Sequence, residues 1–115
     1  LVHSHPAAER EDAYVYPEVF PNLDRHMGEY DGIVLGHTHV QGCRAVAGGF
    51  VLNPGSVGQP RDGDPRAGYA VLDTTAEGTG AVETRRVSYD IDRVAEAVRE
   101  AGLPELTAER LYEGE

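Results

Sequence analysis

Short apolar runs separated by glycine and proline dominate the pattern of hydrophobic and polar positions. Ile33-Val34-Leu35 is wholly apolar and stops at Gly36, which predicts a strand buried on both faces of a sheet. Residues 44–47 and 50–52 are two further strand candidates, which Gly48-Gly49 would join as a tight hairpin turn. Three more predicted strands are residues 69–72, residues 82–89 at a sheet edge, and Leu1-Val2 as the end of a buried strand.

Helical periodicity is confined to three segments. Apolar spacing predicts a short amphipathic helix after a cap at Asn22, with a stripe formed by Leu23, His26, Met27 and Tyr30. Asp90 is a suitable cap for a second helix that ends before Gly102 and has the stripe Ile91, Val94, Ala95 and Val98. A last helix is expected over residues 106–112. The long segment between residues 53 and 66 is rich in glycine and proline and predicts a shaped, functional loop.

Composition narrows the class of protein. The 115 residues suffice for one domain, 1–115, and carry a net charge of -10, which opposes binding to nucleic acid or anionic lipid. No apolar run approaches the ~20 residues of a membrane helix. Lone Cys43 excludes an internal disulfide, so a cytoplasmic location is expected and any metal is held by His, Asp or Glu. All ten basic residues are Arg; with the acid excess this favours a salt-adapted (halophilic) protein over a purely GC-biased one.

Histidines follow two of the predicted strands. Gly36-His37-Thr38-His39 comes directly after a buried strand, and on extended backbone the two imidazoles would point to the same side. His3 ends the Leu1-Val2 segment in the same way. Because the carboxyl ends of parallel strands meet at one crevice, we expect His3, His37 and His39 to face one site. Neutral imidazole binds zinc, iron, nickel, cobalt and manganese, so this is a candidate metal site.

Other polar residues are weaker candidates. Asp24 and His26 have the spacing of a metal motif, but on a helix they diverge, so His26 is interpreted as a hydrogen-bonded structural histidine. His5 is equally compatible with the site and with a surface role. Asp73 is interpreted as a turn former before Thr74-Thr75 rather than as a bridging metal ligand.

Two arginines in the long loop are candidate substrate ligands. Arg61 and Arg66 flank Asp62-Gly63-Asp64 and are suited to bidentate contact with a phosphate. The same acids are equally able to hold them in salt bridges within the loop. Both interpretations stay open at this stage, with the structural one somewhat favoured.

The motifs together resemble a known family. Gly36-His37-Thr38-His39, residues 53–58 (Asn-Pro-Gly-Ser-Val-Gly), residues 59–62 (Gln-Pro-Arg-Asp) and residues 69–73 are similar to the calcineurin-like metallophosphoesterases, in their small phosphodiesterase branch. The resemblance spans roughly residues 1 to 89 and implies an α/β fold, the carboxyl-terminal half of a four-layer α/β/β/α sandwich. It departs from the family at Ser4, where glycine is usual.

The resemblance also implies a mechanism and its ligands. His39 corresponds to a ligand of the first metal ion, and His37 and His3 correspond to ligands of the second. A hydroxide that bridges the two divalent ions then attacks the phosphorus of a phosphoester substrate. Manganese is the expected metal, with zinc, iron, nickel and cobalt as alternatives. The sequence leaves the metal, the substrate and the oligomeric state open.

The family's amino-terminal motifs have no counterpart in this sequence. These motifs are Asp-x-His, Gly-Asp-x-x-Asp and Gly-Asn-His, and they contain the bridging carboxylate and the catalytic histidine. No catalytic residue is therefore assigned, and the chain is expected to be an inactive fragment that needs an amino-terminal half. Two alternatives are a non-catalytic scaffold that keeps the fold for protein binding and a mononuclear histidine-zinc site complete within the chain.

Overall fold

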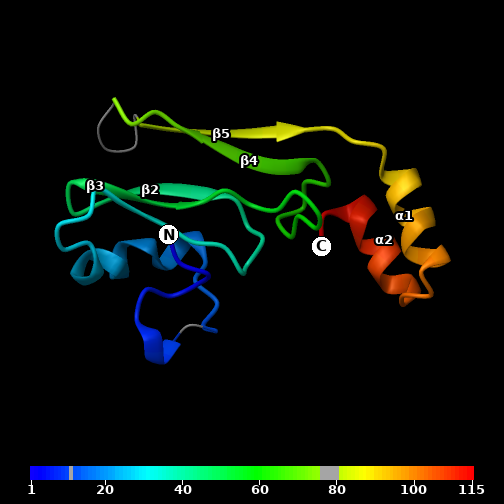
Figure 1. Ribbon diagram of the computed structural model, residues 1–115, viewed down its shortest axis with the longest axis horizontal. Coiled ribbons are helices and arrows are strands. Elements are labelled where there is room, and N and C mark those ends of the chain that lie inside the picture. The colour runs from blue at the N-terminus through cyan, green and yellow to red at the C-terminus, as the bar shows by residue number, and fades with distance from the viewer. Residues whose placement is uncertain (11, 76–80) are drawn as a thin grey trace.

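The structure is a computed structural model that describes residues 1–10, 12–75 and 81–115. Figure 1 shows two β-sheets stacked in layers, a 3-10 helical segment against one of them, and a helical hairpin beyond their ends. The described helices are η1 (Ala8–Arg10), η2 (Pro17–His26), α1 (Ile91–Glu100) and α2 (Glu105–Glu113). The described strands are β1 (Gly32–Val34), β2 (Gly42–Val46), β3 (Gly49–Asn53), β4 (Ala67–Leu72) and β5 (Val82–Val87).

The first sheet has the strand order β1-β3-β2. Strand β1 pairs with β3 in parallel, with Ile33 opposite Val51, and β2 pairs with β3 in antiparallel fashion. Strand β3 is buried along its whole length because both of its edges and both of its faces are covered. Its alternating side chains therefore enter two separate hydrophobic clusters, as expected for a central strand.

The two clusters lie on opposite faces of this sheet. Segment η2 covers one face with a core of Val15, Phe20, Leu23, Met27, Ile33, Leu35, Val46 and Val51. The antiparallel pair β4–β5 covers the other face, over Phe50, Leu52 and Ala81 with Val34, Cys43, Ala70 and Val82 packed beside them. The prediction that the Ile33-Val34-Leu35 strand is covered on both faces is therefore confirmed. Strand β5 ends at Val87, two residues earlier than predicted.

The hairpin between β2 and β3 differs from the prediction by one residue. Val46 pairs with Gly49, so the turn consists of Ala47 and Gly48, which both have positive φ angles (48° and 83°). Gly49 is instead the first residue of β3. A Cβ atom at this position would overlap the Asp31 carbonyl oxygen and lie 2.6 Å from Met27 Cε. Glycine at position 49 thus permits close approach of two backbones rather than a turn.

The first helical segment also differs from the prediction. It is a 3-10 helix that begins at Pro17, with Tyr16 as its N-cap residue, rather than an α-helix that begins after Asn22. Proline is favoured in the first turn because its missing N–H has no partner there. Leu23 and Met27 are buried as predicted, but the Tyr30 side chain is 73% exposed because the helix has ended at His26.

The helical hairpin α1–α2 follows the sequence closely. The Asp90 carboxylate accepts a hydrogen bond from Arg93 N (3.0 Å) and caps α1 as predicted. Gly102 ends the helix with a φ of 70°. The hairpin has a small cluster of its own, Ala95, Ala108 and Leu111, and a hydrogen bond from Gly63 N to the Gly114 carbonyl (3.1 Å) links it to the loop before β4. None of the helices in the described residues is long and apolar enough to cross a membrane.

Candidate functional site

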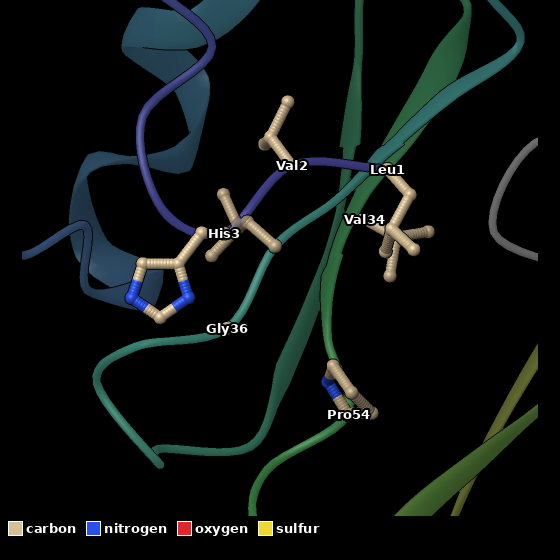
Figure 2. A pocket seen from close by; sticks show the side chains of 7 residues that line it. Leu1, Val2, His3, Val34, Gly36 and Pro54 are labelled. Atoms are coloured by element: carbon tan, nitrogen blue, oxygen red, sulfur yellow. The ribbon is translucent and has the colours of Figure 1, made fainter. Parts of the chain in front are cut away.

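The first residues of the chain place His3 at the carboxyl end of β1. Val2 N donates to the Val34 carbonyl and Gly36 N donates to the His3 carbonyl, both at 2.9 Å, although the structure assigns no strand to Leu1-Val2. A largely apolar pocket of about 390 Å³ lies beside them, lined by residues that include Leu1, Val34 and Pro54. Figure 2 shows His3 at one side of this pocket and Leu1 and Val34 on the other.

His3 and His37 meet at this end of the sheet. His3 Nε2 lies 2.9 Å from His37 Nδ1, and the two ring centroids are 4.7 Å apart in an edge-on arrangement. When two imidazole nitrogens each bind one metal ion at about 2.1 Å, with a nitrogen–metal–nitrogen angle of about 90°, the nitrogens lie about 3.0 Å apart. The contact is a hydrogen bond in this structure, and without its proton the two nitrogens have the spacing of two neighbouring ligands of one metal ion.

The backbone of His37 and His39 is not extended, contrary to the prediction. Both residues have positive φ angles, 67° for His37 and 62° for His39. Strand β1 ends at Val34, and Thr38 N donates to the Gly36 carbonyl (2.8 Å), so the chain already turns at this motif. Left-handed backbone at a residue other than glycine costs about 1–3 kcal/mol, and such strain persists where surrounding contacts hold it.

Buried contacts from Thr38 and Asn53 hold this strained turn. Asn53 Nδ2 donates to the Gly36 carbonyl (3.1 Å) and to Thr38 Oγ1 (2.9 Å), while its Oδ1 accepts from Gly55 N (2.9 Å). The Asn53 and Thr38 side chains are 0% and 2% exposed. Sequence reasoning gave neither residue a role. The available signal was a polar Asn53 that directly follows an apolar strand, because a buried amide requires partners.

His39 is oriented by the long loop. Its Nδ1 lies 2.7 Å from the Gln59 carbonyl oxygen, which only accepts hydrogen bonds, so Nδ1 carries the proton and Nε2 carries the lone pair. The His39 carbonyl in turn accepts from Arg61 N (3.2 Å). A carbonyl behind a histidine ring in this way is the usual arrangement of metal-binding histidines, since it fixes the tautomer and the ring orientation.

The three predicted metal ligands are only partly brought together. His3 and His37 are in contact, whereas His39 makes its ring contact with Gln59. Within residues 1–10, 12–75 and 81–115, no three His, Cys, Asp or Glu side chains form a group that could hold a metal ion. Tyr14, which sequence reasoning did not single out, packs on the His37 ring with a centroid distance of 4.3 Å.

The remaining candidate histidines and acids have structural partners. The His5 and His26 rings meet edge to face at 5.1 Å, and His26 Nε2 accepts from Arg25 Nε (3.3 Å), as expected for a structural histidine. Burial, followed by the charge of His26, lowers the pKa of His5. Asp73 accepts from Thr75 N and Thr75 Oγ1, which confirms the predicted turn and lowers the pKa of the Asp73 carboxyl.

The two candidate substrate-binding arginines differ in their partners. Arg66 Nη2 forms a salt bridge of 2.7 Å with Asp64, and hydrogen bonds from Arg66 lower the pKa of the Asp64 carboxyl to about 2. Arg61 is exposed, and its guanidinium donates to the Gln59 side chain (3.0 Å). The salt-bridge interpretation therefore applies to Arg66, whereas the Arg61 guanidinium contacts a neutral amide.

Comparison with known proteins assigns the family. A sequence model of the calcineurin-like phosphoesterase superfamily domain matches residues 1–77, and the chain belongs to this superfamily. The crystal structure of a metallophosphoesterase from Sphaerobacter thermophilus is similar, with a TM-score of 0.82 and 33% identity over 99% of this chain and 55% of that one. The α/β fold class implied by the sequence resemblance is thereby confirmed.

Two further proteins are also similar. An uncharacterized protein of Methanocaldococcus jannaschii is 32% identical over 130 residues, which cover 99% of this chain and 51% of the relative. The structure of a hypothetical protein from Pyrococcus horikoshii OT3 shares the fold, with a TM-score of 0.78 and 20% identity over 99% of this chain and 45% of that one. The chain thus spans about half the length of the relatives it matches.

Proposed function

We propose that this chain carries the histidine ligands of a metal-dependent phosphoesterase site that hydrolyses phosphodiesters. The contact of 2.9 Å between His3 Nε2 and His37 Nδ1 carries the proposal. Membership of the calcineurin-like phosphoesterase superfamily, which implies divalent metal ions, supports it.

Each residue has a distinct part in this proposal. His3 and His37 hold one divalent ion, and His39 binds a second ion through Nε2, the nitrogen that the Gln59 contact leaves with its lone pair. Manganese is the proposed metal, with zinc, iron, nickel and cobalt as competitors. Divalent ions bound here supply Lewis-acid chemistry and activate water. Arg61 binds the phosphate of the substrate, because its guanidinium, unlike that of Arg66, is not held by Asp64.

The remaining ligands come from a polypeptide segment outside these 115 residues. Two cations close together repel each other, so three neutral imidazoles require anionic ligands beside them. Relatives of about twice this length provide room for such a segment. In this proposal the segment packs against the apolar pocket beside Leu1 and Val34, next to His3.

A non-catalytic scaffold is the second candidate function. It is favoured by one observation, the lack of a three-ligand metal group within the described parts of the chain. Positive φ angles at His37 and His39 favour the metal site instead, because strained backbone at residues other than glycine is concentrated at functional sites. Metal binding by this chain therefore separates the two functions.

Titration of the 115-residue chain with Co²⁺, followed by visible absorbance, tests the histidine pair. Imidazole binds Co²⁺ more tightly than Mn²⁺, so a site that lacks its carboxylates is best detected with Co²⁺. His3→Ala and His37→Ala should each weaken binding at least about tenfold. His26→Ala, the matched control, should leave binding unchanged. Equal effects of all three substitutions would contradict the assignment.

Hydrolysis of bis-p-nitrophenyl phosphate with excess Mn²⁺ tests whether the site is complete. The isolated chain should show negligible turnover, far below the roughly 1 per second at which ordinary enzymes begin. Turnover in the ordinary range would show that the 115 residues contain a whole active site. That outcome would overturn the proposal of ligands from another segment.

A further inference from the structure

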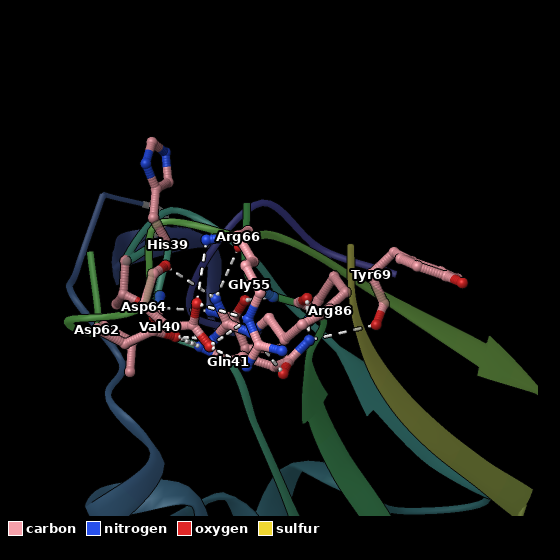
Figure 3. A network of polar contacts seen from close by, with 12 residues as sticks. His39, Val40, Gln41, Gly55, Asp62, Asp64, Arg66, Tyr69 and Arg86 are labelled. Atoms are coloured by element: carbon pink, nitrogen blue, oxygen red, sulfur yellow. Dashed lines mark hydrogen bonds and ion pairs between the residues drawn. The ribbon is translucent and has the colours of Figure 1, made fainter. Parts of the chain in front are cut away.

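Arg86 is a partly buried cation that no motif or predicted role explains. It lies on β5, beyond the residues 1–77 that match the family, and its side chain is 13% exposed. Figure 3 shows it in a network with Gln41, Asp62, Asp64 and Arg66, close to the loop that carries His39. Because a buried guanidinium is costly unless its donors are used, the partners of Arg86 indicate what the residue does.

The Arg86 guanidinium donates to acceptors in two other segments of the chain, Gln41 and residues 62–66. Nη2 pairs with Asp62 Oδ2, and Nε donates to Gln41 Oε1 (3.0 Å). Nη1 donates to the backbone carbonyls of Arg66 (3.2 Å) and Asp64 (3.4 Å). The fork of the guanidinium thus joins β5 to both ends of the segment between residues 62 and 66 and to Gln41.

Asp62 continues this network toward His39. Its Oδ2 also accepts from Gln41 N (2.9 Å), while its Oδ1 is buried without a hydrogen-bond partner among the described residues. The Asp62 side chain is 14% exposed, and Arg86 is its ion-pair partner. The position of the loop at Asp62 therefore depends on its contacts with Arg86 and Gln41.

The loop pinned at Asp62 is the loop that holds His39. Three residues before Asp62, the Gln59 carbonyl contacts His39 Nδ1 at 2.7 Å, and Arg61 N donates to the His39 carbonyl at 3.2 Å. Gln41, two residues after His39, is fixed by the same Asp62 carboxylate. The segment that carries His39 and the segment that carries Gln59 are thus both held by Asp62.

We propose that Arg86 is a positioning residue for the candidate metal site: through Asp62 and Gln41 it holds the loop whose Gln59 carbonyl sets the orientation and tautomer of His39. The proposal rests on the proposed function only where it makes His39 a metal ligand. The link from Arg86 to the His39 ring stands on the hydrogen bonds alone. Outer contacts of this kind affect metal affinity because they fix the ligand before the ion arrives.

Arginine is required by the shape of this network. A lysine ammonium would satisfy Asp62 as a point charge, but it lacks the planar fork that also reaches Gln41 and the Asp64 and Arg66 carbonyls. The neighbouring Arg85 is a matched control. Its side chain is exposed on β5 and pairs with Glu83 at 2.7 Å. Only its backbone carbonyl contacts the network, by accepting from Gln41 Nε2 (3.1 Å), and a side-chain substitution keeps that carbonyl.

Long-range ¹H–¹⁵N correlation spectra of the imidazoles in the full 115-residue chain, at a pH where they are neutral, test the proposal. In the unsubstituted chain His39 should show one protonated nitrogen, Nδ1, and one unprotonated nitrogen, Nε2. In Arg86→Gln the ¹⁵N chemical shifts of His39 Nδ1 and Nε2 should approach a common averaged value. The Gln59 carbonyl is then no longer held in place, so the ring exchanges between its two tautomers. Arg86→Lys should show a smaller change in the same direction. His26 should be unchanged in both variants.

Three results would overturn the proposal. The first is an unaltered His39 spectrum in folded Arg86→Gln or Arg86→Lys. The second is the same His39 change in Arg85→Gln, which would indicate general loosening of β5. The third is failure of Arg86→Lys to fold while Arg85→Lys folds, which would make Arg86 a requirement of the fold rather than of the His39 orientation. If the unsubstituted chain bound no Co²⁺ but showed the His39 tautomer response, the proposed function would fail and the positioning role of Arg86 would remain.

Discussion

The loops around the histidines and the α1–α2 hairpin are built in opposite ways. The hairpin uses local devices: an aspartate cap, an apolar stripe and a glycine stop, all within one stretch of sequence. The histidine loops, residues 36–41 and 54–66, use left-handed backbone that is stabilised by contacts with distant segments. The comparison shows that the site geometry depends on long-range polar contacts, whereas the hairpin depends on its own packing.

Removal of the Asn53 amide should have the largest effect. Asn53→Ala removes two donations, to the Gly36 carbonyl and to Thr38 Oγ1, and leaves Gly55 N without its acceptor. Each buried polar group left unsatisfied costs about 1–3 kcal/mol, so we expect unfolding in urea to become about 3–4 kcal/mol easier. The backbone of His37 and His39 should also relax, because the contacts that hold its positive φ angles are lost.

Amide spectra of the histidine loop provide the structural measurement for this variant. The matched control is Asn22→Ala, since Asn22 is exposed and should change stability by no more than about 0.5 kcal/mol. If Asn53→Ala cost as little as the control, the strained turn would have to be stabilised by other contacts. The conclusion that the histidine loops depend on long-range polar contacts, unlike the α1–α2 hairpin, would then be wrong.

A smaller and more local effect is expected in the hairpin. Leu111→Ala removes the largest side chain of the Ala95–Ala108–Leu111 cluster, which should cost about 2 kcal/mol, the low end for a buried leucine in a small cluster. Amide hydrogen exchange should accelerate in α1 and α2 while β1 and β3 keep their protection. The control Leu106→Ala changes a side chain that is 53% exposed and should leave exchange unchanged. Equal acceleration in β3 would show that the hairpin and the sheets unfold as one unit.

The elements that sequence reasoning predicted well are those with local signals. The Asp90 cap, the Asp73 turn and the buried strand around Ile33 depend on residues that are neighbours in sequence. The start of η2 was missed because the prediction followed apolar spacing from Asn22 and gave no weight to Pro17, which is well placed in a first turn. The hairpin turn was displaced by one residue because Gly49 is required by the Asp31 backbone, a tertiary contact.

The contact between His3 and His37 was expected from the sequence, whereas the backbone shape around His37 and His39 was not. The adjacency of His3 and His37 was expected from two strand ends that meet; in the structure it arises because residues 1–3 run beside the end of β1 without forming a strand. The left-handed backbone at His37 and His39 does not follow from any local pattern, because β-region backbone is the default after a strand. The anchors Asn53 and Arg86 act across separations of 15 to 45 residues, so their roles are visible only in the folded chain.

The smallest expected effect concerns the exposed side-chain pair Arg66–Asp64, whose backbone carbonyls, but not side chains, contact Arg86. Hydrogen bonds from Arg66 lower the pKa of Asp64 to about 2, from an ordinary value of 3.8. A carboxyl with a lowered pKa stabilises the folded state above its ordinary pKa and loses that contribution as the pH falls toward 2.

Arg66→Ala should therefore raise the pKa of Asp64 toward 3.8, as measured by the ¹³C shift of the carboxyl during a pH titration. The melting temperatures of the variant and the unsubstituted chain should differ slightly above pH 4 and converge near pH 2. The difference should remain small because the Arg66 side chain is 53% exposed and water screens the pair. The control Arg85→Ala removes the partner of Glu83 and should leave the Asp64 titration unchanged. An Asp64 pKa that stays near 2 without Arg66 would mean that this part of the loop, like the turn at His37, is held by backbone contacts rather than by exposed charges.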